Sequence, residues 1–184
     1  ADLWLQIRPG TDDALALAML HVTIEENLYD ADFVSKWTHG FDQLKAHVKS
    51  YSPEWAEEIT WVPAEKIRAA ARLFAASKPS VVEWGCAIEH TPNSIQTDRA
   101  IACLPALTGT IDVPGGWVFG PHILDPFPFL ADNLSEEVKA KRLGSDEFRV
   151  LGQANVMPSA HIPAVFKAMR TGDPYQIRAF MIFG

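Results

Sequence analysis

The 184-residue chain has few cysteines and no excess of positive charge, and both shortages exclude classes of protein. Its two cysteines, Cys86 and Cys103, have no CxxC spacing and no paired histidine motif beside them. Two thiols in this arrangement cannot build a zinc site or a cysteine-ligated iron–sulfur cluster. Basic residues number 16 against 23 acidic ones, for a formal net charge of −7. This balance argues against nucleic acid or an anionic membrane surface as a partner.

The sequence also lacks long apolar runs and the common catalytic motifs. No apolar stretch approaches the roughly 20 residues that span a bilayer, so we expect no direct membrane insertion. Residues 1–30 have neither the basic start nor the cleavage site of a signal peptide. Any targeting signal would therefore lie outside this chain. GxGxxG, Walker A, GxSxG and HExxH motifs are absent.

What is present is the composition of a globular protein, 48% hydrophobic and 21% charged. Hydrophobic periodicity and capping residues predict helices at about 12–26, 31–37, 41–48, 53–58, 63–76, 94–107, 134–143 and 159–171. Short apolar runs predict strands at 3–7, 80–84 and 177–183. This alternation indicates an α/β fold with a parallel sheet covered by helices. Strands at both ends, and only three of them, suggest a segment of a larger protein.

The turn at residues 9–13, Pro-Gly-Thr-Asp-Asp, joins the first predicted strand to the first predicted helix. Free backbone N–H groups and the positive end of a helix dipole meet at such a turn, which suits a phosphate or another acceptor-rich ligand. Gly10 lets the backbone approach a ligand closely, Thr11 can donate to a phosphate, and Asp12 can accept from a base or a pterin. The alternative is an ordinary helix start, with Thr11 as N-cap and Asp12 and Asp13 as dipole partners.

Ligands of an open parallel sheet bind beyond the carboxyl ends of its strands. That rule makes Gly85 to His90, after the second predicted strand, and Gly184, after the third, further candidates. Each has a plainer alternative: Gly85 ends a strand, Cys86 belongs to the core, and His90 is a solvated loop residue. The polar cluster in this region has no fixed geometry in the sequence, so we assign no catalytic residue: Glu83, Glu89, His90 and Asp98.

Several stretches form a recognisable set when taken in order: 7–16, 24–30, 33–34, 51–56, 62–68, 84–85 and 107–116. As a set they resemble the molybdopterin oxidoreductases, the molybdenum or tungsten bis-pterin guanine dinucleotide enzymes of the dimethyl sulfoxide reductase type. The resemblance implies a Rossmann-like domain of the formate dehydrogenase or dimethyl sulfoxide reductase type at 1–120. At 121–184 it implies an irregular segment, helices and a closing strand that belong to the adjoining domain.

The resemblance also implies the cofactor and the residues that touch it. The cofactor would be one molybdopterin guanine dinucleotide of a pair that holds Mo or W. When the family's functional positions are carried over to this sequence, Gly10, Thr11 and Asp12 match the loop that contacts the nucleotide in the family. Gly85, Cys86 and His90 match the loop that approaches the pterin. A [4Fe–4S] centre and the residue that ligates the metal would lie outside this chain, so neither catalytic residues nor metal ligands are expected within it.

In the intact enzyme, such a cofactor would move an oxygen atom or two electrons, or support hydration without net redox. The fragment alone would be inactive. Its expected partners are the remaining domains of the parent enzyme and an electron-transfer subunit. Two other hypotheses stay open at this point. One is a small hydrolase that uses the Glu83–His90 cluster. The other is a non-catalytic α/β interaction module with a surface of partly exposed tryptophans: Trp4, Trp37, Trp55, Trp61 and Trp117.

Overall fold

A computed structural model describes residues 1–120, 133–148 and 160–182. The chain divides into two compact units, Ala1–Pro121 and His122–Gly184. The described residues of unit 1 form two clusters of buried side chains, and those of unit 2 form one. No helix in the described ranges is long and apolar enough to cross a membrane.

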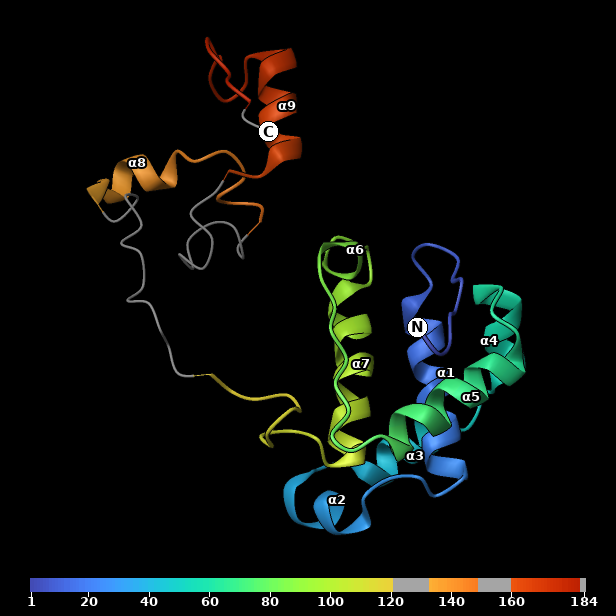
Figure 1. Ribbon diagram of the computed structural model, residues 1–184. Coiled ribbons are helices and arrows are strands. Elements are labelled where there is room, and N and C mark those ends of the chain that lie inside the picture. Colours follow the sequence, from blue (N-terminus) through green and yellow to red (C-terminus); the bar gives the residue numbers. More distant parts are fainter. Residues whose placement is uncertain (121–132, 149–159, 183–184) are drawn as a thin grey trace. The chain divides into compact units, whose positions relative to one another are not determined.

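Unit 1 is helical in the part of the chain described (Figure 1). Six of its helices agree with the sequence prediction to within two residues at each end. A seventh, the single turn α6, was not predicted. The helices are α1 (Asp12–Glu25), α2 (Ala31–Trp37), α3 (Phe41–Val48), α4 (Pro53–Thr60), α5 (Ala64–Ala76), α6 (Cys86–Glu89) and α7 (Ser94–Thr108).

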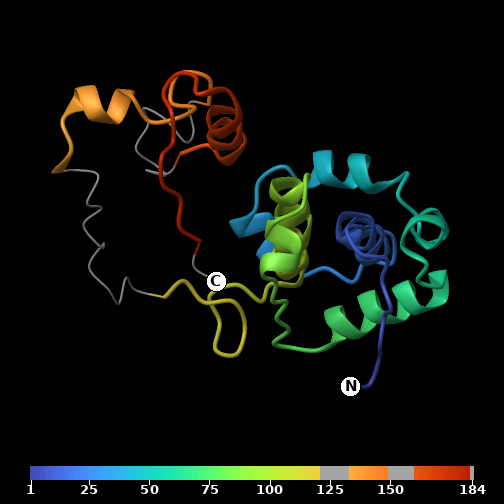
Figure 2. The same ribbon diagram turned by 90° about the horizontal axis from the view of Figure 1, so that it is seen from above.

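Helix α1 lies at the centre of unit 1, and α3, α4, α5 and α7 surround it (Figure 2). Its buried residues are spread around the whole helix instead of forming one stripe, as expected for a helix packed on all sides. Ala18 belongs to a cluster with Ala56 of α4 and Ile67 of α5, where small side chains let the helices approach closely. The buried residues of α1 are Ala14, Ala16, Ala18, Leu20, Val22, Thr23 and Ile24.

Local capping sets several of the helix boundaries. The Asp30 carboxylate accepts the N–H of Phe33 at the start of α2 (2.9 Å). Ser52 accepts from the third residue of α4, whose first residue is a proline. Gly109 ends α7 in the left-handed region (φ +68°), and a Cβ there would lie 3.1 Å from the carboxylate of Asp30. These signals lie within a few residues of the ends they define, which is why sequence reading found them.

The predicted Rossmann-like α/β fold is wrong for the described residues, which contain no strand and only one isolated bridge, between Ile111 and Trp117. Residues 3–7 keep a strand-like alternation, since Leu5 and Ile7 pack on the core while Trp4 is exposed. An extended segment becomes a strand only when a neighbouring segment pairs with its backbone. Segments 3–7, 80–84 and 177–182 have no such neighbour among the described residues, so the parallel sheet does not form there.

Unit 2 contains α8 (Glu136–Ala140) and α9 (Ile162–Thr171) in its described residues. Leu143, Val165 and Ala168 are its buried core. Both helices are shorter than predicted, and α9 has His161 at its N-cap position. The predicted cap Ser159 and most of the predicted irregular segment lie outside the described residues.

Candidate functional site

The two loops selected from the sequence lie at the same end of unit 1. Helices α1 and α7 pack side by side and run in the same direction (Figure 1). At their N-terminal ends Asn93 Nδ2 donates to Asp13 Oδ2 (2.9 Å). At the other end the Asp30 N–H donates to the Leu107 carbonyl (2.8 Å). The 9–13 turn, which opens α1, and residues 85–90, which precede α7, therefore face a common region.

The turn at residues 9–13 differs from an ordinary capped helix start. Thr11 occupies the N-cap position, but its hydroxyl donates to the Arg8 carbonyl (2.7 Å) and does not cap the helix. Asp13 takes over the capping, since its Oδ1 accepts the N–H of Ala14 (2.8 Å). The first helical bond joins the Leu15 N–H to the Thr11 carbonyl. The amides of Asp12 and Asp13 therefore precede the helical ladder, where a ligand can accept from them.

Gly10 and Asp12 are open to the surroundings of this turn. Gly10 adopts φ +77°, and a Cβ built there would meet nothing within 4 Å. The Asp12 side chain is half-buried, and among the described residues its carboxylate has no hydrogen-bond or ion-pair partner. A free carboxylate at the start of a helix can accept a pair of N–H donors from a planar base.

Sequence reading missed a contact between Arg8 and Trp61. The Arg8 N–H donates to the Thr60 carbonyl at the end of α4 (2.9 Å). Its guanidinium carbon lies 5.2 Å from the centroid of the Trp61 ring. Trp61 follows α4 in the left-handed conformation, with φ +65°. The signal in the sequence was a large aromatic residue directly after a helix, where the chain commonly needs glycine.

The second loop is the one-turn helix α6 with its flanks. Gly85 is extended, and a Cβ there would meet nothing within 4 Å. Cys86 is exposed, which excludes the plainer alternative that it belongs to the core. His90 ends the turn, where its N–H donates to the Cys86 carbonyl (3.1 Å), and its side chain is exposed. Burial raises the pKa of the other thiol, Cys103, which packs beside the core of unit 1.

A pair of tryptophans anchors the segment before Gly85. The ring centroids of Trp84 and Trp117 lie 4.8 Å apart, and Trp117 Nε1 donates to the Val82 carbonyl (2.8 Å). The loop after α7 therefore holds residues 82–84 in place, although no strand forms there.

The structure does not assemble the polar cluster near this loop into a catalytic group. Glu83, Glu89 and His90 are exposed, and no hydrogen bond or ion pair joins them to one another in the described part of the chain. The same residues include no group of three or more His, Cys, Asp or Glu able to hold a metal ion. Gly184 lies outside the described residues.

Two arginines of α5 form ion pairs that belong to the scaffold of unit 1. Arg72 of α5 binds Glu26 through two hydrogen bonds of 2.7 and 2.8 Å, which lower the pKa of Glu26. Arg68 of α5 lowers the pKa of Glu54 in the same way. These pairs join α5 to the end of α1 and to α4, and neither includes a residue of the two candidate loops.

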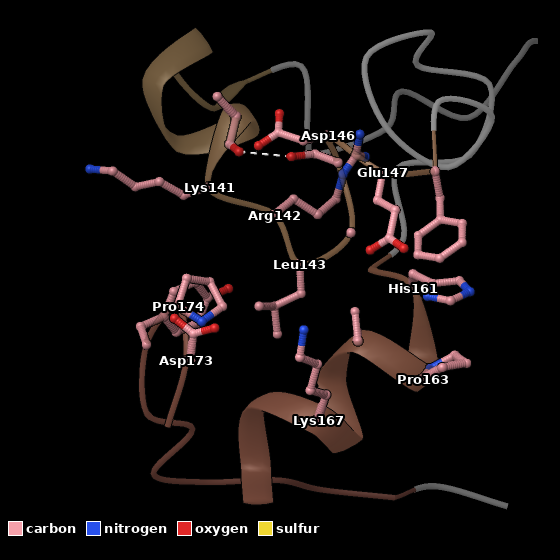
Figure 3. Close-up of a pocket in the computed structure, with 16 residues that line it drawn as sticks. Lys141, Arg142, Leu143, Asp146, Glu147, His161, Pro163, Lys167, Asp173 and Pro174 are labelled. Atoms are coloured by element: carbon pink, nitrogen blue, oxygen red, sulfur yellow. Dashed lines mark hydrogen bonds between the residues drawn. The ribbon is translucent and has the colours of Figure 1, made fainter. Parts of the chain in front are cut away.

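Unit 2 has a cavity of about 760 Å³ between the segment after α8, helix α9 and residues 173–175 (Figure 3). The His161 ring stacks on Phe148 with centroids 3.6 Å apart, and its Nδ1 is buried without a hydrogen-bond partner among the described residues. Lys167, Glu147 and Asp173 also line the cavity. None of the site residues predicted from the sequence does.

Comparison with known proteins identifies the class. The molybdopterin oxidoreductase family matches residues 1–171. This match covers most of the chain, so the chain belongs to the molybdopterin oxidoreductases, and the predicted resemblance is confirmed. The family implies a molybdenum or tungsten pterin cofactor for the enzyme to which the chain belongs.

Individual relatives come from several branches of this family. Acetylene hydratase of Syntrophotalea acetylenica is 34% identical over 204 residues, which cover 98% of this chain and 28% of that protein. Formate dehydrogenase H of Escherichia coli is 40% identical over 62% of this chain and 16% of its own. Dimethyl sulfoxide reductase DmsA of Haemophilus influenzae is 38% identical over 76% of this chain and 20% of its own.

Among solved structures, acetylene hydratase from Pelobacter acetylenicus is similar with a TM-score of 0.76 at 34% identity. The similarity covers 98% of this chain and 28% of that one. The chain therefore spans less than a third of the length of the relatives described.

Proposed function

We propose that this chain is the part of a molybdopterin-dependent oxidoreductase that contacts one pterin guanine dinucleotide. Gly10, Thr11 and Asp12 bind the nucleotide, and Gly85, Cys86 and His90 approach the pterin. The observation that supports this assignment is the Asn93–Asp13 hydrogen bond between α7 and α1. It joins the 9–13 turn to Asn93, which stands at the start of α7 just after the second loop, and the two loops are more than 70 residues apart in the sequence.

The chemistry of the two loops fits the organic part of this cofactor. Space is open beside Gly10 and Gly85. The amides that precede the α1 ladder suit phosphate oxygens. The Asp12 carboxylate suits the N–H edge of guanine, which presents two adjacent donors, and adenine lacks this pair. The family resemblance, and not the structure, is the ground for assigning the metal ligand and the [4Fe–4S] centre to other parts of the parent enzyme.

The cofactor, when bound, supplies the transfer of an oxygen atom or of two electrons. The residues of this chain bind it and orient it. We therefore expect the chain to be inactive by itself and to act with the remaining domains of its parent enzyme and an electron-transfer subunit.

Hydration without net redox is a second candidate reaction for the parent enzyme. It is favoured by the acetylene hydratase relative, whose similarity runs along 98% of this chain. An assay of the purified parent protein separates the two, since a hydratase turns over with neither an electron donor nor an acceptor consumed.

The alternative of a non-catalytic interaction module has weaker support. Trp4, Trp37 and Trp61 are between 68% and 77% exposed, as a partner surface would require. One of the three, however, is engaged by Arg8 beside the candidate loop.

A binding experiment on the 184-residue chain tests the nucleotide assignment. NMR titration with GDP should shift resonances of residues 10–13, and ADP should bind more weakly because adenine lacks the donor pair. Replacing Asp12 with Ala should weaken GDP binding by at least about 10-fold, the value of one hydrogen bond to a charged group.

The matched control is Asp42→Ala, since Asp42 occupies the first turn of α3 as Asp12 does that of α1. Equal affinities for GDP and ADP, or equal losses in the two variants, would refute the assignment of Asp12. Absence of any GDP-dependent shift would refute the nucleotide site as a whole.

A further inference from the structure

Trp61 is a large aromatic residue in a backbone conformation that costs free energy. It adopts φ +65° directly after α4, the position at which helices commonly take glycine. For a bulky side chain this left-handed conformation is an outlier. The ring is also 68% exposed, so its own burial does little to stabilise the arrangement. Outliers of this kind gather at binding sites, where the strain holds a group in place.

The group that Trp61 holds is Arg8, which is tethered in three ways. Its N–H donates to the Thr60 carbonyl (2.9 Å), and its own carbonyl accepts from the Thr11 hydroxyl (2.7 Å). Its guanidinium carbon lies over the Trp61 ring, 5.2 Å from the ring centroid, in a cation–π contact. A cation–π contact needs no hydrogen-bond acceptor, and no described residue accepts a hydrogen bond from the guanidinium, so its N–H edges are free. No carboxylate in the described part of the chain pairs with Arg8.

The charge of the neighbouring turn, residues 9–13, indicates what the free N–H edges of the Arg8 guanidinium bind. Asp12 and Asp13 stand side by side at the start of α1 and carry negative charge into the turn. A nucleotide whose base is read there brings phosphates, which these carboxylates repel. A fixed cation beside the turn cancels this repulsion, and a guanidinium binds phosphate through two parallel hydrogen bonds.

We propose that Arg8 binds a phosphate group of the nucleotide taken up by the Gly10–Asp12 turn, and that Trp61 positions Arg8 for this contact. The inference rests on the nucleotide-binding function proposed above. Arg8 is the binding residue, and Trp61 acts only through it.

The test compares GDP with guanosine on the 184-residue chain, because the two ligands share the base and differ in the phosphates. NMR titration measures both affinities and follows the Nε–H resonance of Arg8, which Arg8→Gln identifies by its disappearance. We expect GDP to shift this resonance and guanosine to leave it in place. Arg8→Gln should reduce the affinity for GDP about 10-fold and leave that for guanosine unchanged.

Two variants of Trp61 separate positioning from folding. Trp61→Gly removes the ring and accepts φ +65° without strain, so the backbone is expected to stay folded. It should weaken GDP binding about 3- to 5-fold, while Trp61→Phe retains most of the affinity. Because Trp61 acts through Arg8, the double variant Arg8→Gln/Trp61→Gly should lose no more than Arg8→Gln alone. The control is Arg72→Gln, which removes an arginine already engaged by Glu26.

The outcomes distinguish this proposal from the one on which it rests. Equal affinities for GDP and guanosine would overturn the phosphate contact and leave the base-binding turn intact. A preference for GDP that survives Arg8→Gln would overturn the role of Arg8, and additive losses in the double variant would overturn that of Trp61. If neither ligand shifts any resonance of a helical chain, the nucleotide site itself is wrong and this inference falls with it.

Discussion

Replacing Gly116 with alanine should destabilise unit 1 by about 2–4 kcal/mol. A Cβ at this position would lie 2.1 Å from the Thr110 carbonyl oxygen, so the backbone has to move. That carbonyl accepts the N–H of Trp117 (2.9 Å), and Thr110 is buried. Losing the bond leaves a buried carbonyl unpaired, which costs roughly 1–3 kcal/mol. The contact between Trp117 and Trp84 contributes roughly 0.5–1.5 kcal/mol more.

Urea unfolding followed by tryptophan fluorescence measures this effect on unit 1 alone. All six tryptophans lie between residues 4 and 117, within that unit. The control is Gly85→Ala, since Gly85 has ordinary extended backbone and open space at its Cβ. It should change the free energy of unfolding by less than about 0.5 kcal/mol. The near-UV circular dichroism of the Trp84–Trp117 pair should weaken in Gly116→Ala only.

An unfolding free energy of Gly116→Ala within 0.5 kcal/mol of the parent chain, as for an ordinary surface substitution, would refute this reasoning. The loop after α7 would then adapt without breaking the Thr110–Trp117 hydrogen bond. In that case the anchor that holds residues 82–84 would not depend on the close approach at Gly116.

Three other predictions concern packing, pH and thiol reactivity. Ile67→Ala removes a fully buried side chain and should lower the free energy of unfolding, measured in urea, by about 3 kcal/mol. Leu73→Ala, on the exposed side of the same helix, should lower it by less than about 1 kcal/mol. The pKa of Glu26 is lower in the folded chain than in the unfolded chain, because Arg72 binds its carboxylate. The Glu26–Arg72 pair therefore stabilises the fold fully above the ordinary pKa of glutamate, and this stabilisation is lost as the pH falls through the pKa that Glu26 has in the folded chain. On acidification, the free energy of unfolding of Glu26→Gln should therefore fall less than that of the parent chain. Exposed Cys86 should react with a thiol reagent before Cys103, whose pKa burial raises, and mass spectrometry of the partly labelled chain would show the order.

The helices of unit 1 could be predicted because their signals are local. Asp30, Ser52 and Gly109 each bond or bend within a few residues of the helix end that they define. The single turn α6 has too few residues for a periodic pattern, and it was missed. The strands were wrongly predicted because alternation shows which side chains are buried, but not whether another backbone lies alongside.

The candidate loops were visible in the sequence, since Gly10 and Gly85 stand at turns between apolar segments. Their family was also determined by the sequence, from stretches spread over residues 1–120. Only tertiary structure decided that the loops face one region, because α1 and α7 meet through Asp13 and Asn93, residues 80 positions apart. It likewise decided that the Arg8 guanidinium lies over the Trp61 ring. Composition and spacing describe each segment by itself, whereas a binding site depends on which distant segments pack together.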